Sequence, residues 1–477
     1  MQPGEEGSLV LRVTRSGRRA EATLYATYPR ARLASPSCPT RFEGMTTTAH
    51  DESAQGFAHS TVPIEATGPA RTVFFIVAGS CCGLPVFILA SNVTVGLGFR
   101  NALAAFVVGS IISGVLGGLS AYAGARTRMS LPLLAQRTFG RWGAQVVKLA
   151  IALSLIGWFG VIVSVLGATA GATMQRIFGV SVPSAAISIP LSALITFVVL
   201  KGVTGLERLG QVIVPLTAVL LAIAVFMTAG KLDTAALTQA SGALGFGAAV
   251  SAIVGSYIVG ITIQPDYGRF VRRPSGAGMA AFLALGVIYP IVLFMSAIPS
   301  TALGQPDLVT ALIALGIGLP ALGLLLMGAW MDSSACLYSG SLSLANLFPR
   351  WPLSRIVIGV GVFGAVLALL HVEEHFMPFL ELLSIALPPV AAVQCSEAIR
   401  PSHPVQSAAE DPAFRWPAIA AWIAGTALGL ASAHTGFSIT GIATLDSIVG
   451  ALAATGVLRG LVAFAASSRV ATDVGEP

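Results

Sequence analysis

Asp332 is the side chain with the clearest capacity for chemistry, because it lies near the middle of a long apolar run, residues 320–346. A carboxylate at the centre of a bilayer costs about 2.5–3.5 kcal/mol, so an acid in that position indicates a function. Asp332 could ligate sodium, bind a proton or accept hydrogen bonds from a polar solute. In the structural alternative, Ser333, Ser334 or a neighbouring helix satisfies the carboxylate. A second acid, Glu381, lies near the outer end of its expected helix and can reach water.

Two aromatic side chains are candidates for binding a flat ring. Trp158 lies between Gly157 and Gly160 in the middle of an apolar run, which leaves its ring face open for stacking. The alternative is a tryptophan that packs against other helices or lipid. Tyr257 could supply the opposing face and a hydroxyl. Ser256 beside it could hydrogen-bond the solute or its own helix, and the second is the commoner fate of serine in membrane helices.

Glycine and proline interrupt two apolar runs at matched positions, 79–85 (GSCCGLP) and 255–260 (GSYIVG). Such breaks free backbone amides and carbonyls, which a solute, an ion or neighbouring helices must then satisfy. Paired interruptions in two halves of a carrier indicate a binding site near the middle of the membrane, although glycine is also a common packing residue there. We therefore expect both of these helices, the first and the sixth of the apolar segments, to be broken, with the site between them.

Acidic and basic residues lie together at two expected inner helix ends, Asp266 with Arg269 and Glu207 with Arg208. Such pairs often hold an inner gate shut, although exposed pairs are individually weak. Anchoring by positive charge at the inner surface would also explain the two arginines. We take Asp266 and Arg269 as candidate gate residues.

A membrane enzyme and a transport-like sensor are the alternatives from other classes. The run 371–375 (HVEEH) has imidazole and carboxylate spacing that could hold a metal ion on a helix, yet it falls in an expected solvated outer loop. No nucleophile motif or phosphate loop accompanies it, and the five cysteines show no metal-ligand spacing. Neither tail resembles a signalling domain. We predict no enzymatic activity, no resident metal and no organic cofactor.

The composition requires a membrane environment. Of the 477 residues, 55% are hydrophobic and 10% are charged, whereas an ordinary soluble domain is about 25% charged. The formal net charge of +6 does not indicate a nucleic-acid partner, because the basic residues cluster in short loops, as they do in proteins that orient by positive charge. The outer face must therefore meet a lipid bilayer.

Twelve apolar segments are long enough to span a bilayer, which takes about 20 residues each. They are 72–95, 101–125, 145–172, 183–200, 211–230, 244–263, 276–299, 320–346, 353–370, 376–396, 415–433 and 444–466. Residues 307–319 are too short to span and are expected to form a re-entrant or interfacial helix that could act as an outer lid. Beyond the N-terminal tail, only Arg100, Arg176 and Lys231 among the Lys and Arg residues fall on the outer side. This asymmetry predicts that both termini are cytoplasmic. We expect the protein in the inner (cytoplasmic) membrane.

The spacing of the two breaks predicts an all-α integral membrane protein with two inverted five-helix repeats, 71–230 and 244–398, and two C-terminal helices within 415–466. The transporter domain is expected over 67–470, with a C-terminal tail at 471–477.

The N-terminal tail, residues 1–66, is arginine-rich and then polar, which predicts disorder. Met45 resembles a natural start, with residues 1–44 outside the working protein.

Several short motifs together resemble one family. They are IGWFG at 156–160, VGSY at 254–257 with PDYGRF at 265–270, the stretch from Trp330 to Tyr338 with Ala345-Asn346, and Leu383-Ser384 with Pro388-Pro389-Val390. GART at 124–127, LAQR at 134–137 and FG at 139–140 extend the likeness to about residues 66–466. The chain is similar to the purine–cytosine permease group of the nucleobase:cation symporter family.

This resemblance implies alternating access to a central site. The substrate ring would lie between Trp158 and Tyr257, with Ser256 near it. The resemblance also implies a sodium site around Gly79 and Gly83 of broken helix 1, together with helix 8.

Two departures from the family pattern concern the solute and the ion. Leu155 stands where relatives carry a glutamine that hydrogen-bonds the base, which argues against cytosine itself. In helix 8, Met331 and Asp332 replace a pair of sodium-binding hydroxyls, and Ser333 begins a stretch that is rich in asparagine in relatives. A thioether is a poor sodium ligand, so Asp332 is either a charged sodium ligand or a proton carrier. We favour the proton.

The sequence thus predicts a symporter that imports a nucleobase or related heterocycle with Na⁺ or H⁺. A hydantoin, allantoin or vitamin-like ring is the alternative solute. The candidate substrate residues are Trp158, Tyr257, Ser256, Leu155 and Ser333. The oligomeric state is not predicted.

Overall fold

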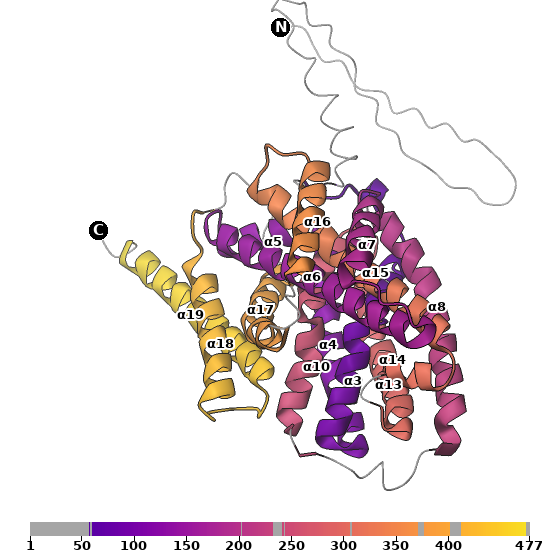
Figure 1. Ribbon diagram of the computed structural model, residues 1–477. Coiled ribbons are helices and arrows are strands. Elements are labelled where there is room, and N and C mark those ends of the chain that lie inside the picture. Colours follow the sequence, from indigo (N-terminus) through magenta and orange to yellow (C-terminus); the bar gives the residue numbers. More distant parts are fainter. Residues whose placement is uncertain are drawn as a thin grey trace, which may run out of the picture. The chain divides into compact units, whose positions relative to one another are not determined.

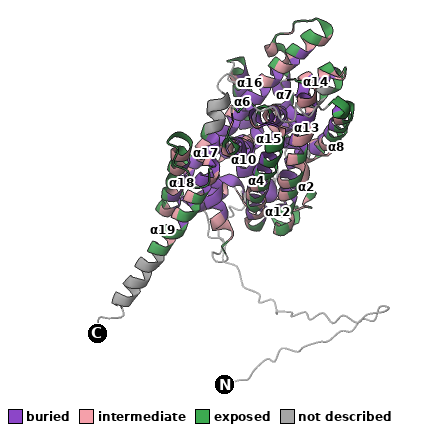
Figure 2. Ribbon diagram, turned by 90° about the horizontal axis from the view of Figure 1, so that it is seen from below, coloured by how far each residue is buried: buried purple, intermediate pink, exposed green. Residues whose placement is uncertain are grey.

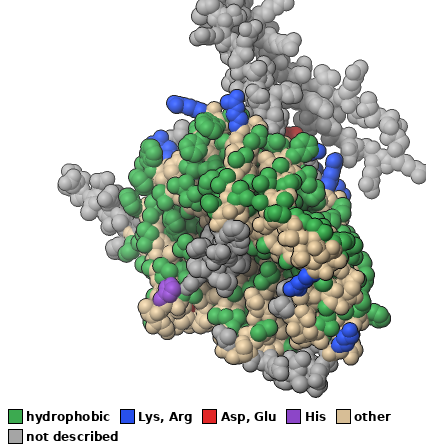
Figure 3. Space-filling model, in the orientation of Figure 1, with side chains coloured by type: hydrophobic (Ala, Val, Ile, Leu, Met, Phe, Trp, Pro, Cys, Tyr) green, Lys and Arg blue, Asp and Glu red, His purple; other side chains and the backbone are tan. Residues whose placement is uncertain are grey.

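A computed structural model describes residues 57, 60–201, 203–231, 241–242, 244–305, 308–370, 376–400 and 412–473. All of these described residues belong to one of the chain's two units, His50–Pro477. Within them the regular structure is helical, apart from one isolated bridge between Gly68 and Val271. Hydrophobic side chains cover most of the face seen in Figure 3, and most of the lysines and arginines visible there lie along its upper margin.

The α-helices of the described residues follow one another along the chain as in Figure 1. They are α2 (Arg71–Ser80), α3 (Leu84–Leu97), α4 (Phe99–Thr127), α5 (Leu131–Phe139), α6 (Gly143–Phe178), α7 (Ser184–Val199), α8 (Val203–Thr228), α10 (Phe246–Thr262), α11 (Gln264–Gly268), α12 (Pro274–Leu283), α13 (Tyr289–Leu303), α14 (Leu308–Ala314), α15 (Gly318–Leu347), α16 (Leu353–Leu369), α17 (Phe376–Ala398), α18 (Trp416–His434) and α19 (Ala443–Asp473). Short 3₁₀ turns lie at Ile64–Ala66 and Ala229–Lys231, and a π-turn at Ala284–Ile288 joins α12 to α13.

Each of the twelve expected ranges overlaps one of these helices or a helix pair. Six helices among the described residues are long and apolar enough to cross a membrane, and α2 with α3 makes a seventh bent span. Four shorter apolar helices accompany them, in α7, α10, α16 and the second part of α17. The chain is therefore a helical integral membrane protein.

The predicted interruption of helix 1 is confirmed. α2 and α3 meet at an angle of 57°. The amides of Cys81 and Cys82 close the last turn of α2 on the carbonyls of Val77 and Gly79. Gly83 is then extended, with φ −81° and ψ 157°, and Pro85 lies in the first turn of α3. Proline suits that position because the first helical amides have no partner within the helix.

The predicted break at residues 255–260 of helix 6 is wrong, because α10 runs without interruption to Thr262. The two glycines make room for neighbours instead. A Cβ on Gly255 would lie 2.7 Å from the Cβ of Ser384, and one on Gly260 would lie 2.5 Å from the Tyr257 ring. The helix is interrupted later, at Ile263, just before α11 begins with a proline in its first turn.

Two short helices bear on the sequence predictions. α5 was not expected because its nine residues are too few to span a bilayer. In the expected lid, 307–319, residues 308–314 form α14, whereas Asp307 lies outside the described residues. The run 371–375, the Glu381 side chain and most of the expected N-terminal tail also lie outside the described part.

Buried residues concentrate in α6, α10 and α15 (Figure 2). α18 and α19 lie side by side next to α17 at one edge (Figures 1 and 2). Large apolar side chains are exposed on outer helices, such as Phe226 on α8 and Val362 on α16. This inversion of the soluble pattern fits a lipid-facing surface.

Candidate functional site

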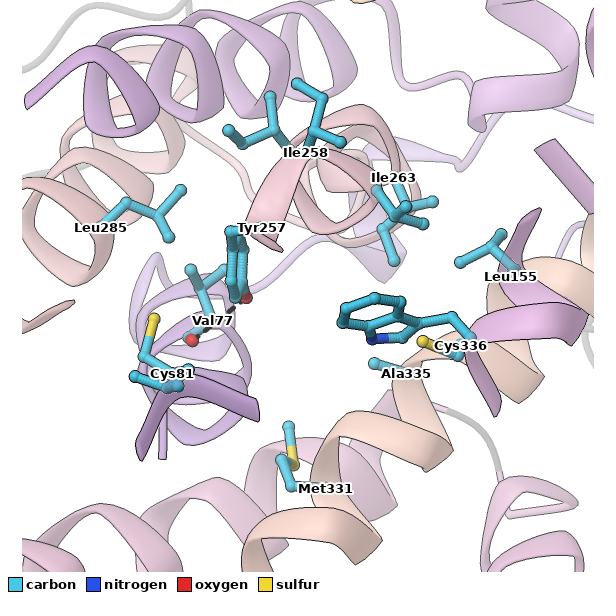
Figure 4. Packing of buried hydrophobic residues seen from close by; sticks show 14 of the residues in the cluster. Val77, Cys81, Leu155, Tyr257, Ile258, Ile263, Leu285, Met331, Ala335 and Cys336 are labelled. Carbon is cyan, nitrogen blue, oxygen red and sulfur yellow. Dashed lines mark hydrogen bonds between the residues drawn. The ribbon is translucent and has the colours of Figure 1, made fainter. Parts of the chain in front are cut away.

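A small cavity lies where the break between α2 and α3 meets α6, α10, α11 and α15, and Figure 4 shows several of the residues around it. It is lined by Ser80, Pro85, Val86, Trp158, Ser256, Tyr257, Val259, Gly260, Ile263, Tyr267, Asp332, Ala335 and Cys336. Its volume of about 20 Å³ holds roughly one water molecule. A heterocycle can enter only if the surrounding helices move apart.

Trp158 and Asp332 meet at this cavity. The indole Nε1–H of Trp158 donates to Oδ2 of Asp332 at 3.4 Å. Oδ2 also faces the helix break, since a Cβ on Gly83 would lie 3.6 Å from it and 3.5 Å from the carbonyl oxygen of Ser80. A backbone oxygen and a carboxylate oxygen thus flank Gly83, an arrangement with the ligand chemistry that a small hard cation or a proton requires.

Tyr257 connects α10 to the end of α2. Its hydroxyl donates to the carbonyl oxygen of Val77 at 3.2 Å, drawn as the dashed line in Figure 4. The same carbonyl accepts the Cys81 amide that closes α2. The Tyr257 ring also contacts that of Tyr289, with centroids 5.9 Å apart. These contacts hold the ring at the cavity wall.

The Ser256 hydroxyl lines the cavity but is already hydrogen-bonded. It donates to the carbonyl oxygen of Ile253 in its own helix at 2.9 Å and lies 2.7 Å from the hydroxyl of Tyr289. Of the two roles considered for Ser256, the structure shows the hydrogen bond to its own helix.

α15 packs directly against the broken helix, so Gly79 and Gly83 both adjoin it. A Cβ on Gly79 would lie 3.1 Å from Cγ of Met331, and one on Gly328 would lie 2.3 Å from the Cys82 carbonyl oxygen. Gly79 thus makes room for a methionine side chain, whereas Gly83 faces Asp332. The space beside Gly79 is therefore filled by the Met331 side chain, whereas the space beside Gly83 is bordered by oxygen atoms.

Leu155 and Ser333 are not among the described residues that line the cavity. Leu155 is buried, and its Cβ would be 3.3 Å from a Cβ on Gly340 of α15. Ser333 is buried with no hydrogen-bond partner for its hydroxyl among the described residues. It follows Asp332 directly, and consecutive residues of a helix point in different directions.

Several other residues line the cavity that were not predicted from the sequence. Ala335 and Cys336 lie three and four residues after Asp332, and that helical spacing places them on its face. Tyr267 reaches the cavity from α11, and its hydroxyl donates to the Ala335 carbonyl oxygen at 3.4 Å. The late helix interruption at Ile263 carries it there, so the misplaced break concealed it.

Asp266 and Arg269 are fully buried. Arg269 donates from Nε to the Asp266 carbonyl oxygen at 3.2 Å and from its NH2 nitrogen to the Tyr338 hydroxyl at 3.2 Å. Its NH1 nitrogen donates to the carbonyl oxygen of Phe57 at 2.8 Å. The Leu131 amide of α5 donates to Asp266 Oδ1 at 2.8 Å. Anchoring at the membrane surface does not explain a buried arginine, so that alternative is wrong for Arg269.

Glu207 pairs with the start of α2. Its Oε1 lies 3.3 Å from Nε of Arg71, and its Oε2 accepts a hydrogen bond from the Thr72 hydroxyl at 2.8 Å. Its sequence neighbour Arg208 is exposed. The acid therefore joins α8 to α2.

A broken apolar helix, a carboxylate facing the break and an aromatic-lined cavity between helices define a membrane carrier with a central site. Residues 63–452 match the family of permeases for cytosine/purines, uracil, thiamine and allantoin. The chain belongs to this family, and it is a transporter rather than an enzyme. The family resemblance predicted from the sequence motifs is confirmed.

Individual relatives agree with this assignment. Cytosine permease of Escherichia coli K12 is 27% identical over 403 residues, which cover 83% of this chain and 92% of the relative. Among solved structures, Mhp1, a nucleobase-cation-symport-1 family transporter, in a closed conformation with bromovinylhydantoin bound has a TM-score of 0.71 at 16% identity, covering 85% of this chain and 96% of that one. Mhp1 in its inward-facing conformation gives 0.67 at 18% identity, with coverage of 85% and 93%. A Na⁺-coupled sialic acid symporter gives 0.61 at 12% identity, with coverage of 86% and 92%.

Proposed function

We propose that this protein is a secondary active symporter that imports a nucleobase or related heterocycle across the cytoplasmic membrane by alternating access. In this proposal twelve helices span the membrane with both termini cytoplasmic. The segments 71–230 and 244–398 are inverted repeats, and α18 and α19 are appended to them.

The observation that carries the proposal is the hydrogen bond between Trp158 and Asp332 at the helix break. Trp158 stacks on the solute ring, and Asp332 holds the coupling ion. Because the carboxylate orients the indole, a change in its charge or ligation alters the ring-binding surface. Ion binding and solute binding are then linked through one contact, as coupled transport requires.

The cavity chemistry supports a small, flat and polar solute. Trp158 and Tyr257 offer aromatic faces, while Ser80 and Asp332 offer polar atoms at the edge. The Leu155 position supplies no amide to read a base edge. A hydantoin, allantoin or vitamin-like ring therefore remains the alternative solute. The closed cavity of about 20 Å³ agrees with a carrier in a state between its two openings.

For the coupling ion we favour a proton on Asp332. Asp332 is the one carboxylate among the described residues that line the cavity. Met331 precedes Asp332 and stands at one of the two positions where relatives carry a sodium-binding hydroxyl. It is buried against Gly79, and its sulfur is a poor ligand for sodium. Sodium held by Asp332 and backbone oxygens beside Gly83 is the alternative.

The test is a ligand screen of the purified full chain by thermal unfolding, using nucleobases, hydantoins, allantoin and thiamine, each with and without sodium. We expect one ring class to raise the unfolding temperature. Uptake of the positive ring into proteoliposomes under a pH gradient or a sodium gradient then identifies the ion. Stabilisation by an aliphatic amino acid and by none of the rings would overturn the proposal.

A further inference from the structure

A second cavity, of about 480 Å³, lies between the ends of α5 and α17, the start of α18 and the middle of α19. It shares no lining residue with the central cavity. We call it the arginine cavity, because Arg400, Arg415 and Arg459 line it together with one acid, Glu397. The transport cycle proposed above makes no use of it.

The charge of the arginine cavity favours an anion. Three arginines against one glutamate leave an excess of two positive charges among its described lining residues. Glu397 and Ser396 both accept hydrogen bonds from the NH2 nitrogen of Arg459, which fixes that guanidinium at the wall. Guanidinium groups present several donors in a plane that matches phosphate oxygens.

The cavity wall is held in place by the backbone. The amides of Arg141 and Trp142 donate to the carbonyls of Pro412 and Ala413, and the amide of Arg415 donates to the carbonyl of Phe139. Gly140 permits this close approach: its φ is +83°, and a Cβ would lie 2.7 Å from the Pro412 carbonyl oxygen. The arginine cavity is thus a formed site.

The first turn of α18 faces the same space. Trp416, Pro417 and Ala418 begin this helix and line the arginine cavity. The amino-terminal end of a helix carries partial positive charge and favours a bound anion. The helix end therefore adds to the field of the three guanidinium groups.

An aromatic pair forms the rim. The rings of Phe414 and Trp416 stack with centroids 5.1 Å apart, and their residues are 42% and 66% exposed. Tryptophan is enriched where membrane proteins cross from hydrocarbon to head groups. A basic interior beside an exposed aromatic rim matches a ligand with a phosphate at one end and a hydrocarbon chain at the other.

We propose that the arginine cavity binds the phosphate of an anionic phospholipid. Basic pockets between membrane helices suit such head groups. Free phosphate shares the charged chemistry but makes no use of the rim. The bound lipid would join α18 and α19 to α5, whose other end carries the Leu131 amide that binds Asp266.

The experiment titrates the purified full chain, in a neutral detergent, with phosphatidylglycerol, phosphatidylcholine or inorganic phosphate and follows thermal unfolding. We expect phosphatidylglycerol to stabilise the wild type at lower concentration than phosphatidylcholine. Arg400→Gln should need about fivefold more phosphatidylglycerol for half the effect. Arg350→Gln removes an exposed arginine outside the cavity and should leave the titration unchanged.

A second variant predicts the opposite sign. Glu397→Gln removes the one acid and should lower the phosphatidylglycerol concentration for half effect, even if the lipid-free protein is less stable. Equal titrations of wild type and Arg400→Gln would overturn the proposal. Stabilisation by inorganic phosphate that matches phosphatidylglycerol, and is lost in Arg400→Gln, would overturn the lipid assignment in favour of free phosphate. Ring binding at the central cavity, measured in the same variants, keeps this test separate from the proposed transport function.

Discussion

Asp332 lies in surroundings that let its charge change. Its partner at the cavity, the Trp158 indole, is a neutral donor, and no lysine or arginine is among the described residues that line the cavity. A buried carboxylate fixed by an arginine would leave an unpaired charge whenever it was neutralised. Asp332 avoids that penalty, so a proton or a cation can bind and leave without disrupting an ion pair.

The first prediction concerns Asp332→Asn, which keeps the shape of the side chain but removes its charge. Uptake driven by an inward proton gradient should fall at least tenfold in proteoliposomes, because the coupling group can no longer take up a proton. In the wild type, uptake should rise as the outside becomes more acidic, and the variant should lose this dependence. Full pH-driven uptake by the variant would exclude Asp332 as the proton site.

The second prediction separates ring stacking from hydrogen bonding. Trp158→Ala should weaken binding of the solute about tenfold or more, since stacking of a heterocycle on an aromatic side chain is worth about 1–3 kcal/mol. Calorimetric titration of the purified protein measures the loss.

Tyr257→Phe is the matched control, because it keeps the ring and removes the hydroxyl with its hydrogen bond to Val77. The Val77 carbonyl retains the Cys81 amide as a partner. Ring affinity should therefore change little. A Trp158→Ala variant that binds as tightly as the wild type would place the solute elsewhere.

At the scale of single helices, hydrophobic length was the reliable signal. Every expected range overlaps a helix because about 20 consecutive apolar residues have few other options in lipid. A glycine in an apolar run did not distinguish a helix break from close packing, because Gly83 lies at a break whereas Gly255 and Gly260 make room for neighbouring side chains. Sequence alone does not show which neighbour approaches a glycine. α5 escaped detection because a nine-residue helix lacks the length of a span.

The candidate site was predictable in part for similar reasons. Trp158, Tyr257 and Asp332 meet at one cavity, as unusual side chains at mid-helix positions suggested. Leu155 and Ser333 were inferred from positions in a family pattern and are not among the described residues that line the cavity. Helix rotation decides which side chains point inward, and that rotation follows from packing between α6 and α15.

The third prediction tests the helix break. Gly83→Ala should fold normally, because the new methyl group would meet Ser80 and Asp332 oxygens at ordinary contact distances of 3.5 and 3.6 Å. It would nevertheless occupy the space between those two oxygens, which is the place proposed for sodium, the alternative coupling ion. Sodium-driven uptake should then fall at least fivefold while the unfolding temperature stays nearly unchanged, whereas uptake driven by a proton on Asp332 should persist.

Gly359→Ala on α16 is the control, since a Cβ there meets nothing within 4 Å. It should preserve both uptake and stability. If Gly83→Ala transported at the wild-type rate with the same sodium dependence, sodium would not bind beside this glycine.

On the scale of the whole described body, several contacts close the end at which α2 begins. The Gly68 amide donates to the Phe270 carbonyl oxygen at 2.7 Å, which places this end beside α11 and the buried Arg269. Glu207 ties α8 to Arg71 and Thr72 at the same end. Opening the central cavity in this direction must separate some of these contacts. The contacts of Glu207 are the more accessible ones, because Arg71 is largely exposed.

The last prediction uses Cys336 as a reporter of that opening. Cys336 is a free, buried thiol that lines the central cavity, two residues before the Arg269 partner Tyr338. Glu207→Gln weakens the charged hydrogen bond from Thr72 by about 1 kcal/mol, which shifts the population of the open state roughly fivefold. Alkylation of Cys336 by N-ethylmaleimide, followed by peptide mass spectrometry, should accelerate by a similar factor.

Two comparisons define what this acceleration means. Arg71→Gln should have a smaller effect, because its side chain is 67% exposed and exposed ion pairs contribute little. A bound solute should slow the alkylation of Cys336 in both variants, since it occupies the cavity that the thiol lines. If Glu207→Gln left Cys336 as unreactive as in the wild type, the contacts of Glu207 with Arg71 and Thr72 would not control this opening. The hydrogen bonds of the buried Arg269 would then be the contacts that limit it.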